Sequence, residues 1–289
     1  MPIVQQPIGV FDSGIGGLSV LQALRAELPH EHFVYLADTA HAPYGERSAE
    51  FVAERSYAIA AHLVAQHGIK ALVVACNTAT AAAIHEIRAR YPQLPLVGVE
   101  PALKPAVALS RTGRIGVIGT RGTLNSAKFG KLLISLQGQA QFIVQPCDGL
   151  AHAIERSTAL DLSRPEFATE IRAICAGYTS IMGRFGIQSG EIDTLVLGCT
   201  HYVFAQNELR DLLGPDIRLI ATGEPVARQT RRLLHTAAAL TANQPDGTAA
   251  SAERLPLLLT TGLLTPLQTA AARWLQLPQE CCSTALVAA

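Results

Sequence analysis

The sequence predicts an α/β protein with two pseudo-symmetric domains, each a mainly parallel sheet flanked by helices, and an active site in the interdomain cleft. Short apolar runs alternate with longer segments whose apolar residues recur at helical spacing. The run Leu-Val-Val-Ala that leads to Cys76 is similar to the run Leu-Val-Leu-Gly that leads to Cys199. Residues 8–10 and 115–117 both read Ile-Gly-Val. Two similar halves are therefore expected, each with a thiol at the end of a strand.

The first half begins with a strand at residues 8–11, followed by a glycine-rich turn and a helix with leucines at helical spacing from Leu18 to Leu28. Further strands are expected at 33–37, 71–75 and 96–99, with helices at 48–67 and 78–90.

The second half repeats the alternation, and its last elements return to the end of the chain. Strands are expected at 115–119, 142–145, 194–197, 218–220 and 257–260, with helices from 123, at 149–155, 165–185, 224–240 and 266–277. Residues 243–247 are expected to form a loop, and residues 278–289 a frayed tail.

In parallel sheets of this kind, ligands bind outside the carboxyl ends of the strands. Ser13 and Thr120 each place a hydroxyl just past the opening strand of a half. The other polar and thiol side chains expected at this edge are Asp12, Cys76, Asn77, Thr78, Cys199, Thr200 and His201.

Composition favours a small-molecule ligand. The formal net charge is zero and the basic residues form no runs, which argues against nucleic acid or an anionic membrane as a partner. No apolar run approaches the roughly 20 residues of a membrane span, and the N-terminus lacks the features of a signal peptide. Six cysteines without CxxC spacing indicate reduced thiols, so a cytoplasmic protein is expected.

The glycine-rich turn at residues 12–17 does not fit the spacing of the nucleotide-binding loops. No Lys-Ser/Thr pair follows it, and Ser19 stands where GxGxxG needs its third glycine. The glycines are expected to let backbone N–H groups approach a ligand carboxylate at the helix N-terminus. The polar loop at residues 38–45 is either a simple turn capped by Asp38 or a lip over the first strand end.

Several roles are open to the two thiols. They can be small buried hydrophobes, zinc ligands together with His201, or a single nucleophile with His201 as its base. A helix N-terminus next to each strand tip is expected to lower the thiol pKa from about 8.5. The matched positions favour inversion of a carbon stereocentre, in which one thiolate removes a proton and the opposite thiol delivers one.

Each thiol has a neighbour able to assist it, Asp12 for Cys76 and His201 for Cys199. Pyridoxal phosphate offers another route to a carbanion, but it needs a Schiff-base lysine. The four lysines, at positions 70, 104, 128 and 131, all lie away from the cysteine-bearing strand tips. A cofactor-free reaction is therefore expected.

Six stretches, taken in order, resemble the glutamate racemase family. They are residues 11–20, 38–45 (Asp-Thr and Pro-Tyr-Gly), 75–80 (Ala-Cys-Asn-Thr-Ala-Thr), 98–101, 198–202 (Gly-Cys-Thr-His-Tyr) and 260–262. One departure follows Cys147, where the family usually has proline and a Val-Pro-Leu run and this chain has residues 148–155 instead.

The resemblance implies a cofactor-independent racemase that makes D-glutamate for bacterial peptidoglycan, with no metal. Cys76 would act on the D enantiomer and Cys199 on the L, assisted by Asp12 and His201. The implied domains are residues 1–99 with 223–289, and residues 100–222; a homodimer is expected. The implied substrate-binding residues are Asp12, Ser13, Pro43, Tyr44, Gly45, Cys76, Asn77, Thr78, Thr120, Thr123, Glu155, Thr200 and His201.

Two other classes remain open. A related racemase acting on aspartate or a hydantoin would share the cysteine pair. A non-catalytic two-lobed amino-acid binding protein would share the cleft but need neither thiol.

Overall fold

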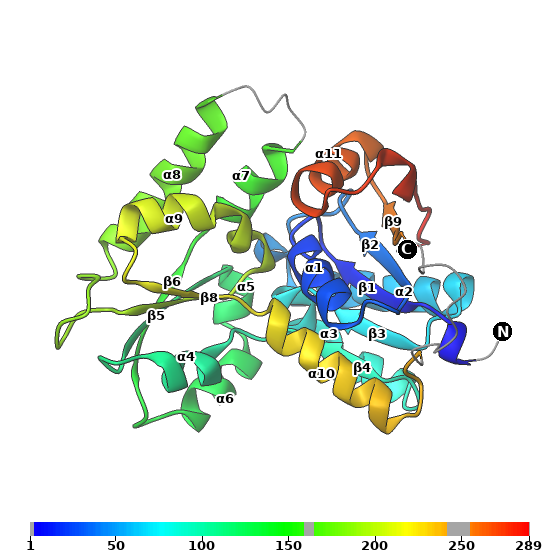
Figure 1. Ribbon diagram of the computed structural model, residues 1–289, viewed down its shortest axis with the longest axis horizontal. Helices are drawn as coiled ribbons and strands as arrows, with labels where there is room; N and C mark the ends of the chain where they lie inside the picture. Colours follow the sequence, from blue (N-terminus) through cyan, green and yellow to red (C-terminus); the bar gives the residue numbers. More distant parts are fainter. Residues whose placement is uncertain (1–2, 159–164, 242–254, 289) are drawn as a thin grey trace, which may run out of the picture.

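The computed structural model describes residues 3–158, 165–241 and 255–288, which form two sheets flanked by helices (Figure 1). Every neighbouring pair of strands is parallel, so the expected α/β class is confirmed. The larger sheet has the order β10-β9-β2-β1-β3-β4 and the smaller one β6-β5-β7-β8. The strands are β1 (Ile8–Asp12), β2 (Phe33–Ala37), β3 (Ala71–Val74), β4 (Leu96–Gly98), β5 (Arg114–Gly119), β6 (Gln141–Pro146), β7 (Thr194–Leu197), β8 (Arg218–Ile220), β9 (Leu257–Thr260) and β10 (Cys282–Thr284).

The two sheets share one internal strand order. β1 lies between β2 and β3 with β4 beyond, and β5 lies between β6 and β7 with β8 beyond. The strands before Cys76 and Cys199 therefore occupy equivalent places, as the repeated sequence predicts. The strands up to β4, with β9 and β10, form the larger sheet, and β5 to β8 form the smaller one, while the expected domains with boundaries at 99/100 and 222/223 stay predictions.

The core depends on strands that are buried on both faces. In β1, Ile8 and Val10 pack in one apolar cluster with α1 (Leu18–Glu27), while Phe11 packs in another with α2 (Ala49–His67) and α3 (Asn77–Arg90). The first cluster continues to Leu195 of β7, so one core runs from sheet to sheet.

The helices are α1 (Leu18–Glu27), α2 (Ala49–His67), α3 (Asn77–Arg90), α4 (Leu103–Leu109), α5 (Arg121–Leu124), α6 (Ala127–Ser135), α7 (Leu150–Arg156), α8 (Pro165–Ser180), α9 (Gln206–Leu213), α10 (Gly223–Thr236) and α11 (Leu264–Leu275), with 3₁₀ turns η1 (Ile3–Gln5), η2 (Tyr44–Glu46), η3 (Thr200–Ala205) and η4 (Gln279–Cys281).

Capping residues decide where several helices begin. The Ser48 side chain accepts a hydrogen bond from the Phe51 N–H at 3.2 Å and starts α2, which ends at Gly68 in the left-handed conformation. The single helix expected from residue 123 is instead two short helices, because Thr120 caps α5 and Ser126 caps α6. The helix expected to reach residue 185 ends at Ser180.

The C-terminal segment is not a frayed tail, and this expectation was wrong. Residues 279–281 form η4, and β10 then pairs in parallel with β9 at the edge of the larger sheet. Cys281 and Cys282 are both buried there. The error has a physical reason: the segment is ordered by its pairing with the edge of β9, and the segment's own sequence does not reveal this tertiary contact.

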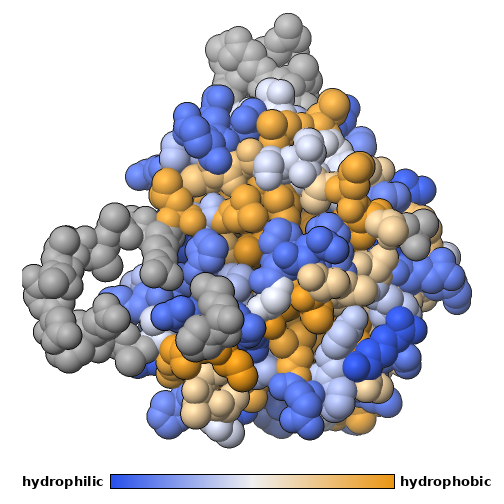
Figure 2. Space-filling view, turned by 90° about the vertical axis from the view of Figure 1, so that its right-hand side faces the viewer, coloured by the Kyte–Doolittle hydropathy of each residue, from blue (hydrophilic) through white to orange (hydrophobic). Residues whose placement is uncertain are grey.

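Figure 2 shows the right-hand side of Figure 1, where apolar and hydrophilic side chains are interspersed. The loop expected at residues 243–247 lies outside the described residues. Within the described ranges, no helix is both long enough and apolar enough to cross a membrane.

Candidate active site

A pocket opens where the carboxyl ends of strands from both sheets meet. Asp12 at the end of β1 and Cys76 just after β3 line it from the larger sheet, and Thr120 and Cys199, just after β5 and β7, line it from the smaller one. The lining residues are Asp12, Ser13, Pro43, Tyr44, Gly45, Cys76, Asn77, Thr78, Thr120, Ala151, Cys199, Thr200 and His201. The structure thus brings together both expected catalytic pairs and most of the expected binding residues.

Cys76 begins α3 and is nearly fully buried. Its sulfur accepts a hydrogen bond from the Ala79 N–H at 3.4 Å and lies 3.9 Å from the Ser13 hydroxyl. Burial, and after it the charge of Asp12, raises the pKa of the Cys76 thiol well above its usual value. The expectation that the helix N-terminus would lower this pKa was therefore wrong, because loss of solvation outweighs one backbone N–H. Cys76 is a neutral thiol at neutral pH.

Cys199 has a different environment, because a 3₁₀ turn and a histidine follow it. The Cys199 sulfur lies 3.6 Å from His201 Nδ1, and His201 Nε2 lies 2.6 Å from the Glu155 carboxylate. Burial opposes charge on the imidazole, but the hydrogen bonds to Cys199 and Glu155 prevail and raise the pKa of His201 well above its usual value. A cationic imidazole therefore stands beside the second thiol.

Asp12 sits between the two halves of the pocket. Its Oδ2 accepts hydrogen bonds from the Gly17 N–H at 2.6 Å and the Thr200 hydroxyl at 3.4 Å. Burial raises the pKa of Asp12, although the positive charge of His201 opposes the shift. Among the described residues, Asp12 Oδ1 and both polar atoms of the Asn77 amide are buried without a partner. These atoms are available to a bound molecule, since buried polar groups are normally hydrogen-bonded.

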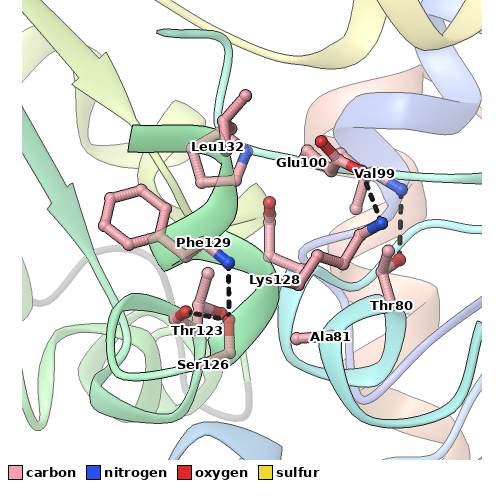
Figure 3. A pocket seen from close by; sticks show the side chains of 11 residues that line it. Thr80, Ala81, Val99, Glu100, Thr123, Ser126, Lys128, Phe129 and Leu132 are labelled. Atoms are coloured by element: carbon pink, nitrogen blue, oxygen red, sulfur yellow. Dashed lines mark hydrogen bonds and ion pairs between the residues drawn. The ribbon is translucent and has the colours of Figure 1, made fainter. Parts of the chain in front are cut away.

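Two threonines, Thr78 and Thr120, line one side of the pocket, and their hydroxyls are grouped with that of Thr123. Thr78 lies 3.1 Å from Thr120 and 3.2 Å from Thr123, and Thr120 donates to Thr123 at 2.9 Å. Thr123 is outside the pocket lining and supports the other two from behind. It lines a second, smaller cavity between α3 and α6, where Lys128 pairs with Glu100 at 2.6 Å (Figure 3).

The glycines of the first turn allow close approach of the other half. A Cβ on Gly14 would lie 1.7 Å from Glu155 Oε1, and one on Gly16 would lie 2.3 Å from His201 Nδ1. The Ile15 N–H donates to Glu155 at 2.7 Å. Two amides of this turn, those of residues 15 and 17, are thus bonded to the protein's own carboxylates rather than left for a ligand.

The positions of some neighbours of the pocket follow only from the folded chain. Ala151 lines the pocket from α7, but an alanine in a helix marks no chemistry. Glu155, one turn further on, lies behind His201 rather than in the lining. Arg55 and Thr261 hydrogen-bond to Asp38 beneath the loop at residues 43–45, and only the folded chain brings them together.

Across residues 3–158, 165–241 and 255–288, no three His, Cys, Asp or Glu side chains are grouped to hold a metal ion. The two thiols and His201 are instead arranged around one pocket with separate partners.

The raised pKa of His201 predicts how stability depends on pH. The charged imidazole stabilises the fold fully below its unfolded pKa of about 6.5, and this contribution is lost as pH rises through the higher folded pKa. The difference in unfolding free energy between the wild type and His201→Gln is therefore expected to shrink from pH 6 to pH 9. Urea denaturation at the two pH values measures it; a difference that grows with pH would show that the imidazole is neutral in the folded protein.

Comparison with known proteins places this chain in a family. Residues 16–230 match the profile of the Asp/Glu/hydantoin racemase family. The chain is 52% identical over 230 residues to a glutamate racemase of Ectopseudomonas mendocina, covering 80% of this chain and 82% of that protein. It is 48% identical over 244 residues to the glutamate racemase of Pseudomonas aeruginosa PAO1, covering 84% and 87%.

Solved structures of glutamate racemases are similar to this chain over nearly its whole length. A glutamate racemase isoform from Bacillus anthracis is similar with a TM-score of 0.80 and 30% identity, covering 98% of this chain and 97% of that one. The Escherichia coli glutamate racemase, solved with L-glutamate and an activator, is similar with a TM-score of 0.77 and 29% identity, covering 98% and 100%. From the profile match, the identities and the fold together, this chain belongs to the Asp/Glu/hydantoin racemase family, with glutamate racemases as its relatives.

Proposed function

We propose that this protein interconverts L- and D-glutamate by proton transfer at Cα between two cysteines, without a cofactor. One observation carries the proposal: two buried thiols at equivalent strand ends of two matching sheets line one pocket. Inversion needs an acid and a base on opposite faces of the same carbon, and this pseudo-twofold arrangement supplies such a pair.

The partners of the two thiols suit a reaction that starts from L-glutamate. With the His201 cation 3.6 Å away to stabilise its thiolate form, Cys199 takes the α-proton, and the electron pair of the C–H bond stays on the substrate. The Cys76 thiol, kept protonated by burial, gives its proton to the opposite face. Once the D product has formed, Cys76 is a thiolate and Cys199 is a thiol.

The reverse reaction begins by removing the proton from Cys76. We assign this assistance to Asp12, whose carboxylate is a stronger base than usual because burial raises its pKa. Glu155 acts through His201, since its hydrogen bond to Nε2 keeps the imidazole charged and oriented. These roles give each thiol its own assisting acid or base.

An amino-acid α-carbon is a very weak acid, so the carbanion needs stabilisation. The Thr78 hydroxyl and the Asn77 amide line the pocket and can donate to substrate carboxylates, and the Thr120 hydroxyl lies 3.1 Å from that of Thr78. The pocket is largely closed by buried residues, which strengthens each of these interactions. We assign substrate binding to these groups and to Ser13, Pro43, Tyr44, Gly45, Thr200 and His201, with Thr123 as support.

The direct test is incubation of the purified protein with L-glutamate in D2O, with reductant and no pyridoxal phosphate. We expect loss of optical rotation together with loss of the α-proton NMR signal. If glutamate binds but neither signal changes, the protein is a binding module. If aspartate or a hydantoin loses its signals and glutamate does not, the substrate assignment is wrong.

Three further properties belong to the same proposal. The D-glutamate would supply peptidoglycan synthesis, as in bacterial relatives, and the free buried thiols suit the reducing cytoplasm. We also infer a homodimer. Light scattering should then give twice the chain mass of 30.7 kDa, whereas a mass of 30.7 kDa would contradict it.

A further inference from the structure

Asp38 is a buried carboxylate that lies outside the pocket and collects hydrogen bonds from four side chains. Arg55 donates through Nε at 3.1 Å and Nη2 at 3.0 Å, Tyr44 through its hydroxyl at 2.5 Å, and Thr261 through its hydroxyl at 2.8 Å. His41 Nδ1 lies 3.0 Å from the same carboxylate. We call these five residues the Asp38 cluster.

The Asp38 cluster joins segments that are far apart in the sequence. Arg55 comes from the middle of α2, Tyr44 from η2, and Thr261 from the turn after β9. The Asp38 N–H also donates to the Asp12 carbonyl at 3.0 Å, which ties the cluster to the strand end that carries a pocket carboxylate.

The charge state of Asp38 supports this role. Burial favours the neutral acid, but the hydrogen bonds from Arg55, Tyr44 and Thr261 outweigh it and lower the pKa of Asp38. The carboxylate therefore stays ionised and accepts from all its donors. Because an Arg–carboxylate pair with two parallel bonds is geometrically specific, the cluster has a defined shape.

Tyr44 connects the cluster to the pocket. Its hydroxyl is committed to Asp38, so the phenol acts as an anchor, while Pro43, Tyr44 and Gly45 line the pocket. On its other side the same loop touches the second half. A Cβ on Gly45 would lie 2.6 Å from the Thr120 Cβ, and Glu46 accepts from the Gly149 N–H at 3.3 Å.

We propose that the Asp38 cluster is the positioning device that sets the 43–45 loop against the pocket and thereby determines the affinity for glutamate; this rests on the proposed function. The members beneath the loop act through it and do not touch the substrate. The two thiols follow β3 and β7, outside the cluster. Loosening the loop should remove contacts made equally in the ground and transition states, which raises KM and leaves kcat.

The test uses Thr261, which is in the cluster but does not line the pocket. Thr261→Val removes the hydroxyl that donates to Asp38, and Thr261→Ser keeps it. We expect Thr261→Val to raise KM for both enantiomers about tenfold with kcat within about threefold, and Thr261→Ser to restore the wild-type KM. Arg55→Lys, which loses the two-bond fork, should raise KM in the same way.

A matched control separates positioning from general destabilisation. Glu31 and Lys70 form another buried ion pair, at 2.5 Å, at the amino-terminal side of the same sheet. Glu31→Gln should lower stability without changing KM. The proposal is wrong if Thr261→Val and Arg55→Lys leave KM unchanged, or if they lower kcat at constant KM.

A second readout does not depend on the reaction. In the ligand-free protein, amide hydrogen exchange over residues 43–47 should be faster in Thr261→Val than in the wild type, and unchanged in Glu31→Gln. Equal exchange in all three proteins would also overturn the proposal. If the wild type fails to racemise glutamate, the proposed function fails, while this comparison still decides whether the cluster positions the loop.

Discussion

Replacing either Cys76 or Cys199 with serine is expected to lower kcat for glutamate racemisation about 10³-fold, because each inversion needs both thiols. A serine hydroxyl is far less acidic than a thiol, so it can neither accept nor return the α-proton at neutral pH, and acid–base groups contribute about 10² to 10⁴ in rate. The side chains are nearly isosteric, so folding should be retained. Racemisation assays in both directions measure the loss.

The single variants should also separate the roles of the two thiols. Cys199→Ser retains Cys76, so in D2O it is expected to exchange the α-proton of D-glutamate without forming the L enantiomer. Cys76→Ser should do the converse. Cys175→Ser is the matched control, because this cysteine is buried in α8 away from the pocket lining. Racemisation that persists in both active-site variants would disprove the two-base mechanism.

Gly16→Ala is expected to lower kcat about 10²-fold while leaving the fold intact. The new methyl group would lie 2.3 Å from Nδ1, 2.6 Å from Cε1 and 2.7 Å from Cγ of His201. This imidazole is held between Cys199 and Glu155, so it can move only by giving up one of those contacts. A displacement of about 1 Å at a catalytic group costs on the order of 10²-fold. Steady-state kinetics and circular dichroism measure the two effects.

Gly130→Ala is the control for this change. Gly130 lies within α6 and a Cβ there would meet no atom within 4 Å, so alanine should preserve activity and raise stability by up to about 1 kcal/mol. If Gly16→Ala were as active as Gly130→Ala, the close contact between the glycine turn and His201 would not matter for catalysis.

The local sequence determined the repeated architecture and which residues could be expected at the site. Apolar runs and turn residues are short-range signals, so the strands before Cys76 and Cys199 could be located and the edge carrying Asp12 and His201 followed from the rule for parallel sheets. The motifs pointed to the loop at residues 43–45, which lines the pocket, while its role in substrate binding stays a prediction.

Tertiary structure alone decided the energetics of that site. Whether the Cys76 thiol is ionised depends on burial by surrounding elements. The helix N-terminus next to Cys76 in the sequence predicts a lowered thiol pKa, whereas burial raises it. The pairing of Glu155 with His201, the Arg55–Asp38 pair and the β10 edge strand likewise join segments distant in the chain. Periodicity and spacing report which residues share a strand or a turn, whereas solvation and long-range contacts are fixed only when separate elements pack together.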